Sequence, residues 1–207
     1  MASTLVLGAA LSRGIWIPAI GRSLVCEEQQ GVVQAILVDN LDTNYGLFER
    51  AARLQREGSR IRILVLTASA NPDAVVDGVV EIMARAAQVH NWETVKIGET
   101  EPISLNAAMQ VRSLLVREDI RSVALVTPGF RSRRSSLAYR AVLSRAGIAV
   151  VCVPVLGQRG VETWMETWHG IQEVALQFLK LQYYRFYVLP RQPEFEPRFV
   201  TRSLLPI

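Results

Sequence analysis

The run "IRILVLTA", from Ile61 to Ala68, decides the fold class. It is an almost continuous apolar stretch, without the regular polar alternation of a strand that has one face in water. Strands with this character belong to parallel sheets that helices cover on both sides. The run therefore predicts a buried strand inside an α/β domain.

Segments of the same kind recur on either side of this run, with helical segments between them. Before it, "NYGLFERAARLQREG" carries apolar residues at helical spacing and closes on Gly58, a residue type that ends helices. After it, a helical segment opens with Asn71 and Pro72, which suit a helix cap and first turn. Further strands are predicted at residues 32–39, 92–98, 122–128 and 148–155, and further helices at 104–117, 131–147 and 162–187. The alternation predicts a three-layer, Rossmann-like α/β fold with a mainly parallel five-stranded sheet.

A chain of 207 residues, half of them apolar, suits a single domain with flanking segments. We expect an apolar N-terminal entry segment at residues 1–31, the α/β domain at 32–190 and an extended, Pro-rich tail at 191–207. The entry segment is broken by Arg13, Gly14 and Pro18, so it falls short of the ~20 apolar residues that span a bilayer. It also lacks the positively charged start of a secretory signal. The expected location is cytoplasmic, with contact at the surface of the inner membrane left open.

Charge and cysteine content limit the classes of site. The net charge is +4, and residues 120–145 hold six arginines and no carboxylate, which favours an anion-facing surface or a solvated helix face. This charge is too mild to predict a nucleic-acid partner. Cys26 and Cys152 are expected to form neither a disulfide framework nor a metal site, and Cys152 is expected to be a small buried apolar residue. His90 and His169 lack ligand-spaced partners, so no metal site is expected.

Ligands of open parallel sheets bind outside the carboxyl ends of the strands. Among the loops there, "TPGFRSRR" carries the clearest signal. Pro128 and Gly129 make a turn, and Arg131 and Arg134 follow as the next helix begins. Free backbone N–H groups, the helix dipole and guanidinium groups together favour a phosphate or a carboxylate. A solvated basic turn is the alternative.

Three other loops contribute weaker candidates. Asp39 could bind a ribose hydroxyl or a cation, or lie in a capped turn that leads into a helix. The small residues around Ser69 leave room for a ligand, but they are also ordinary in a turn. Ser104 is either a helix N-cap or part of a site with Glu101 and Asn106. The candidate ligand-binding residues are Asp39, Asn40, Ser69, Glu101, Ser104, Asn106, Thr127, Arg131 and Arg134.

Two of these loops also carry a family resemblance. In "ETEPISLN", Glu101, Ser104 and Asn106 match the first three places of a Glu–Ser–Asn motif, and "LVTPGFRSRRS" keeps a motif Thr and Arg at Thr127 and Arg134. Through these motifs, and over roughly residues 17–190, the chain resembles the YdcF-like family, which includes the SanA and ElyC envelope proteins. The resemblance implies a Rossmann-like domain with its cleft at these loops. It also implies a link to bacterial envelope or exopolysaccharide metabolism.

The chain departs from the family pattern at several places. The Gly-rich turn after the first strand is replaced by residues 39–41, and the later motif positions become Ala107, Met109 and Gln110. The motif His becomes Arg131, which stays protonated and cannot act as a general acid or base. The remaining residues favour holding an anion over transforming one.

Two functions are therefore compatible with the sequence. In one, the domain binds a small anionic ligand such as a nucleotide or phosphosugar, with any catalysis limited to electrostatic stabilisation by arginine. In the other, it is an inactive accessory or structural subunit of a larger assembly. Its contact surfaces would then be the N-terminal segment, the aromatic run "YYRFY" at 183–187 and the tail, and they would face a protein or a membrane surface. Alternatively, these aromatic residues close the domain's own core.

Overall fold

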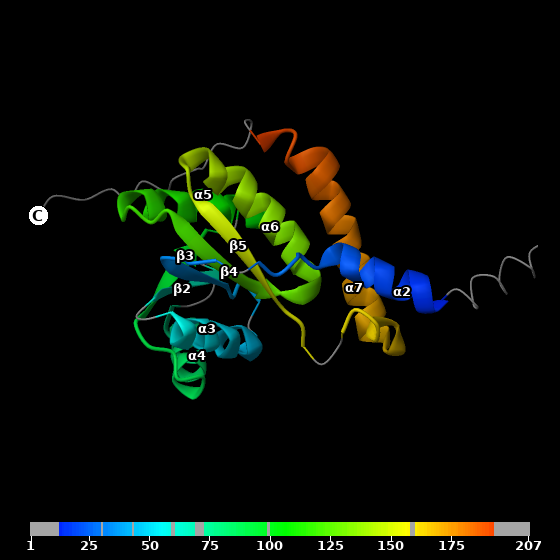
Figure 1. Cartoon of the computed structure of the whole chain (residues 1–207), viewed down its shortest axis with the longest axis horizontal. Coiled ribbons are helices and arrows are strands. Elements are labelled where there is room, and N and C mark those ends of the chain that lie inside the picture. Colours follow the sequence, from blue (N-terminus) through cyan, green and yellow to red (C-terminus); the bar gives the residue numbers. More distant parts are fainter. Residues whose placement is uncertain are drawn as a thin grey trace, which may run out of the picture.

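The sheet has the predicted class and strand number. The computed structural model describes residues 13–29, 31–42, 44–58, 61–68, 73–98, 100–157 and 160–192. All five strands are parallel, in the order β3-β2-β1-β4-β5, so the prediction of a Rossmann-like α/β fold is confirmed (Figure 1). The strands are β1 (Ala35–Asp39), β2 (Arg62–Ala68), β3 (Trp92–Ile97), β4 (Ser122–Pro128) and β5 (Ala149–Val155).

Helices cover both faces of the sheet, which explains the continuous apolar character of the strands. Alternate residues of β1 show this: Leu37 joins the core under α5 and α6, whereas Ile36 and Val38 join the core under α3 and α4. Figure 1 shows these two helix pairs on opposite sides of the sheet, with α2 and α7 together at one end. The helices are α2 (Arg13–Leu24), α3 (Tyr45–Glu57), α4 (Asp73–Ala86), α5 (Ile103–Arg117), α6 (Gly129–Leu143) and α7 (Trp168–Tyr183).

Local signals account for several helix ends. The Asn44 side chain accepts a hydrogen bond from the Gly46 N–H at 3.0 Å and caps α3, which ends at Gly58 as predicted. A short 3-10 turn (Ser144–Ala146) follows α6, and Gly147 closes it at φ 72°, a left-handed conformation that glycine adopts without strain.

The helix predicted at 162–187 is divided into three pieces. A 3-10 turn (Trp164–Glu166) comes first, then Thr167 caps α7 by accepting from the Gly170 N–H at 3.1 Å. A π-helical turn, η3 (Tyr184–Val188), ends it. The close approach of α7 to the 3-10 turn requires Gly170, because a Cβ there would lie 2.0 Å from the Trp164 carbonyl oxygen. Periodicity alone did not reveal this contact.

The cysteine prediction was wrong. Cys152 is buried in β5 as expected, but its sulfur is bonded to that of Cys26, with the two Cα atoms 6.4 Å apart. The pair meets because α2 packs on α6 and α7, and the segment after it then runs beside β5, where the Gln29 N–H donates to the Cys152 carbonyl. The Trp164 indole N–H donates to the Ile17 carbonyl at 2.9 Å and holds α2 in place.

Some predictions fall on residues outside the described ranges. These are the first part of the entry segment, Ser69, the proposed cap at Asn71 and Pro72, and nearly all of the tail. Within the described ranges, no helix combines the length and the apolar character needed to cross a membrane.

Candidate functional site

The candidate site lies where the strand order reverses. From β1, the chain builds the sheet one way through β2 and β3 and the other way through β4 and β5. The pairing of Val38 with Val126 brings the ends of β1 and β4 side by side, so Asp39 and Thr127 are neighbours. Such a switch point is the usual ligand position in open α/β sheets. A pocket of about 390 Å³ opens beside it, lined among others by Asp42, Glu101, Ser104, Arg131, Arg134 and Lys180.

Asp39 is the centre of a buried polar network behind this pocket. Its side chain is almost fully enclosed, and Oδ2 accepts hydrogen bonds from the hydroxyls of Thr127 and Ser135, each at 3.0 Å. The Arg131 Nη2 lies 3.1 Å from Asp39 Oδ1 and donates to the Asp39 carbonyl at 3.0 Å. Buried carboxylates persist when they are paired in this way. Asp39 and Thr127 therefore hold the strand ends together and do not line the pocket.

Arg131 joins this network to the pocket wall. The side chain is buried, and besides Asp39 it forms an ion pair with Asp42, whose side chain is 85% exposed. Two carboxylates therefore neutralise this guanidinium. Arg131 was a predicted anion ligand, but its charge is compensated within the protein.

Arg134 has a different environment. It is only 7% exposed, and it donates to the Ser104 hydroxyl at 2.7 Å and to Gln177 Oε1 at 3.2 Å. Its guanidinium carbon lies 5.2 Å from the centre of the Tyr184 ring, a cation–π distance. Burial lowers the pKa of Arg134, although a guanidinium remains charged at neutral pH. Among the described residues, no carboxylate lies within ion-pairing distance of it, and its buried Nε has no hydrogen-bond partner.

Contacts at the start of α5 account for the residues at positions 101, 104 and 106 in local terms. Helix α5 begins at Ile103, one residue before the predicted start, and Pro102 occupies the N-cap position without a side-chain cap. The N-cap alternative for Ser104 is therefore wrong. Glu101 serves the helix start instead, because its Oε2 accepts from the Ile103 N–H at 3.1 Å. The Ser104 N–H donates to the Tyr184 hydroxyl at 3.1 Å, and the Ser104 hydroxyl accepts a hydrogen bond from Arg134.

Asn106 and Asn40 shape turns. The Asn106 amide donates to the Gly98 carbonyl, while Gln110 Oε1 accepts from the Gly98 N–H at 3.2 Å. Asn40 Oδ1 accepts from the Asn44 N–H at 3.2 Å, so the loop after β1 is a capped turn that leads into α3. Neither residue lines the pocket. Ala107 and Met109, two of the departures from the family motif, are buried in the core between α5 and the sheet.

The pocket also contains residues that were not predicted as ligand-binding residues. Lys180 and Tyr183 come from α7, and Asp42 comes from the turn after β1. A weak signal for Lys180 existed, since the chain has only two lysines. Nothing local in the sequence indicates that α7 lies against α6 at this edge of the sheet, so these residues could not be assigned to the site in advance.

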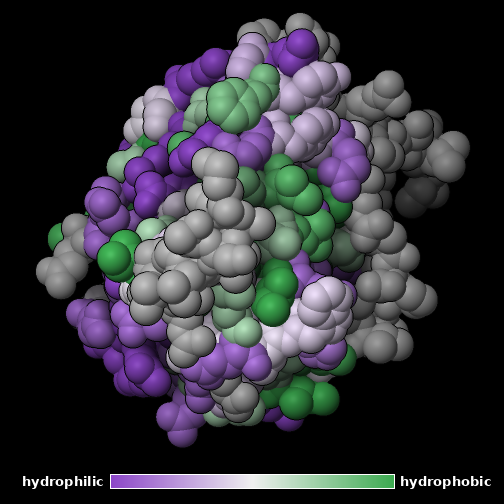
Figure 2. Space-filling model, turned by 90° about the vertical axis from the view of Figure 1, so that its right-hand side faces the viewer, coloured by the Kyte–Doolittle hydropathy of each residue, from purple (hydrophilic) through white to green (hydrophobic). Residues whose placement is uncertain are grey.

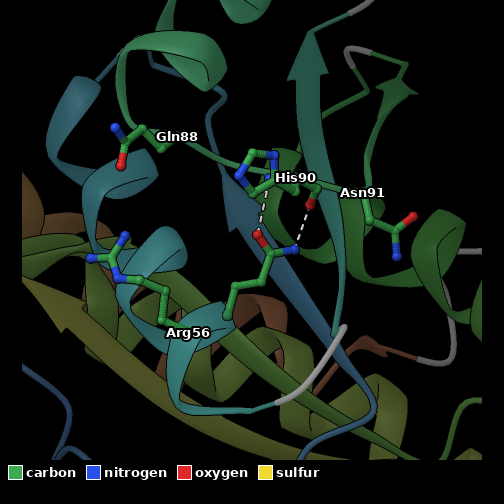
Figure 3. Close-up of a pocket in the computed structure, with 5 residues that line it drawn as sticks. Arg56, Gln88, His90 and Asn91 are labelled. Atoms are coloured by element: carbon green, nitrogen blue, oxygen red, sulfur yellow. Dashed lines mark hydrogen bonds between the residues drawn. The ribbon is translucent and has the colours of Figure 1, made fainter.

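A second hollow, of about 500 Å³, lies at the other end of the strands, next to the start of β3 (Figure 3). Gln55 and His90 line it. Gln55 holds the loop before β3, because Oε1 accepts from the His90 N–H at 3.0 Å while Nε2 donates to the carbonyls of His90 and Ile61. Figure 3 shows both amide atoms of Gln55 bonded to the His90 backbone, which favours a structural role for Gln55 in this hollow. Its His90 is remote from the Arg134 pocket.

Comparisons with known proteins add no assignment, because no family model matches the chain and no curated protein is significantly similar to it. The chemistry must be judged from the site alone. Within the described residues, no group of three or more His, Cys, Asp or Glu side chains is placed to hold a metal ion. Beside the carboxylates of Asp42 and Glu101, the pocket presents a buried guanidinium that has no carboxylate partner among the described residues, a hydroxyl and an exposed ammonium. The guanidinium, the hydroxyl and the ammonium are groups that bind anions.

Proposed function

We propose that the chain is a YdcF-like domain that binds a small anionic ligand beside Arg134 and acts as an accessory or structural subunit without efficient turnover. The observation that carries this proposal is the burial of Arg134 in the pocket wall with no carboxylate partner in the described part of the chain. A buried charge is costly unless a counter-charge accompanies it. A bound phosphate or carboxylate would provide that counter-charge.

The surroundings of Arg134 favour a phosphorylated ligand. The Ser104 hydroxyl and the Arg134 fork approach the pocket from α5 and α6, and Lys180 adds an exposed positive charge from α7. The volume of about 390 Å³ lies within the range of small-molecule sites. A nucleotide or a phosphosugar would fit such a space, with the half-exposed Tyr183 available to contact a base or a sugar ring.

The same residues favour binding over catalysis. Arginine stays protonated at neutral pH and cannot exchange a proton with a substrate. The Thr127 hydroxyl is committed to Asp39, and Glu101 accepts a hydrogen bond at the start of α5. An enzyme that acts on a nucleotide or phosphosugar in envelope or exopolysaccharide metabolism is the second candidate. The presence of the Glu101 and Asp42 carboxylates in the pocket lining favours it.

Calorimetric titration and thermal shift with inorganic phosphate, ADP and a sugar phosphate test the proposal. We expect Arg134→Gln to weaken binding by about 10- to 100-fold, the effect of losing one or two charge-assisted hydrogen bonds. Arg140→Gln is the matched control, because Arg140 lies on the same helix and donates to Gln29 away from the pocket. Lys180→Gln, at an exposed position, separates loss of binding from loss of folding and is expected to weaken binding more modestly.

Two results would count against the proposal. Absence of stabilisation by every ligand, or equal weakening by Arg134→Gln and Arg140→Gln, would exclude an anion site at Arg134. Phosphate release that Glu101→Gln abolishes would favour the enzyme instead.

A further inference from the structure

Helix α7 and η3 carry an apolar outer face. The outer stripe consists of Leu176, Leu179, Tyr183, Phe186 and Tyr187, which are 46–76% exposed. The first four recur at intervals of three and four residues, and Tyr187 lies four residues after Tyr183. Figure 2 looks onto the side of the molecule formed by α2 and α7 and shows hydrophobic residues at the surface among hydrophilic ones.

The inner face of the same helix is also apolar. Val174 and Leu181 pack in the core shared with α2 and α6, and Tyr184 and Val188 join the core under α5 and α6. A helix at the surface of a soluble domain normally turns polar residues outward, so a helix that is apolar on both faces indicates a second contact. The outer stripe is thus not required to close the domain's own core.

Every charged side chain in the segment that carries the stripe, residues 174–192, is positive. From residue 174 to residue 192 the sequence contains no Asp or Glu, and it contains Lys180, Arg185 and Arg191. The Arg191 guanidinium carbon lies 4.2 Å from the centre of the Tyr187 ring, so its charge stays at the edge of the apolar surface. Arginine and lysine commonly extend in this way from an apolar patch towards an aqueous or headgroup layer.

We propose that the outer stripe of α7 docks on the surface of an anionic lipid bilayer. The combination of leucine and aromatic side chains with flanking cations, and with no carboxylate from residue 174 to residue 192, is that of a helix lying in the membrane interface. Tyrosine and phenylalanine bury their rings near the headgroups, and the cations complement the negative surface potential. The stripe runs about 17 Å along the axis from Leu176 to Tyr187, at about 1.5 Å per residue.

Docking would also orient the pocket. Lys180 and Tyr183 belong both to this side of α7 and to the lining of the Arg134 pocket. The pocket would therefore open next to the bilayer surface. The docking proposal does not depend on this point, because it rests on the stripe and its charges alone.

Co-flotation of the full chain with vesicles tests the inference. We expect binding to vesicles of phosphatidylcholine mixed with phosphatidylglycerol, much weaker binding to phosphatidylcholine alone, and loss of binding as salt is raised. Leu179→Asp should weaken binding by about tenfold or more, since it removes a leucine from the apolar contact and adds a negative charge. The control is Ile82→Asp, because Ile82 on α4 is 69% exposed, compared with 66% for Leu179.

Three results would overturn the proposal. They are no flotation with anionic vesicles, equal weakening by the Ile82 and Leu179 variants, and a wild-type dimer that Leu179→Asp dissociates without any vesicle binding. The last result would assign the stripe to a contact between proteins. A charge-only variant, Arg185→Gln with Arg191→Gln, leaves the apolar stripe intact and should selectively reduce the salt-sensitive part of binding.

Discussion

Replacement of Asp39 by alanine is expected to lower the free energy of unfolding by about 3–5 kcal/mol, the cost of breaking a buried ion pair from one side. Asp39 is 1% exposed and Arg131 is 7% exposed, so neither charge is well solvated. Without the Asp39 carboxylate, Arg131 keeps its hydrogen bond to the carbonyl of residue 39, and the exposed Asp42 is its one remaining carboxylate partner among the described residues. The hydroxyls of Thr127 and Ser135 lose their acceptor.

Urea unfolding followed by circular dichroism measures this effect. Glu162→Ala is the control, because it removes an ion pair with Arg22 in which both side chains are more than half exposed, and such pairs contribute about 0–1 kcal/mol. The double variant Asp39→Ala with Arg131→Met removes both buried charges. It should be less destabilised than the sum of the two single variants, because no uncompensated guanidinium remains. Additive effects, or a loss below about 1 kcal/mol for Asp39→Ala, would refute the reasoning.

Two further predictions concern stability. The Cys26–Cys152 bond spans 126 residues, so reduction or Cys26→Ser should lower the free energy of unfolding by about 5 kcal/mol. Thiol titration of the unfolded, unreduced protein should find neither cysteine free, and two reactive thiols would contradict the bond. Burial raises the pKa of Tyr139 well above 10.0, and its hydroxyl has no partner among the described residues. Tyr139→Phe should therefore be neutral or stabilising at pH 7. Above pH 10, Tyr139 ionises in the unfolded state but stays protonated in the folded state, so the free energy of unfolding of the wild type should fall by about 1.4 kcal/mol per pH unit. The variant should lack this fall. If urea unfolding shows that the free energy of unfolding falls equally steeply with pH above 10 in the two proteins, the prediction is wrong.

Local patterns predicted most of the sheet. The strand at Ser122–Pro128 has the predicted bounds, and the strand at Arg62–Ala68 begins one residue later than predicted. These segments are recognisable because both faces of each strand are buried, so nearly every residue is apolar whatever its neighbours are. The final helix was less predictable. Its division at Thr167 depends on contact between Gly170 and the Trp164 carbonyl, and hydrophobic periodicity does not report such a contact.

The candidate site was predicted in position and only partly in composition. Arg134, Ser104, Glu101 and Arg131 do line one pocket. Asp39 and Thr127 do not line it, because the Thr127 hydroxyl donates a hydrogen bond to the Asp39 carboxylate at the ends of neighbouring strands. A single sequence cannot distinguish a polar residue that faces a ligand from one that faces another polar residue. That distinction depends on which partner the fold brings within hydrogen-bond distance.

The sequence by itself determined the α/β class, the parallel sheet and the edge at which polar and basic residues gather, because these follow from local burial patterns and from the direction of parallel strands. Only the tertiary structure decided which polar groups, charges and cysteines find a partner. Asp39 reaches Ser135 across 96 residues, the Ser104 N–H reaches Tyr184 across 80, and Cys26 reaches Cys152 across 126. Such contacts are set by strand order and helix packing, and they leave Arg134 as the buried charge without a carboxylate partner in the described part of the chain.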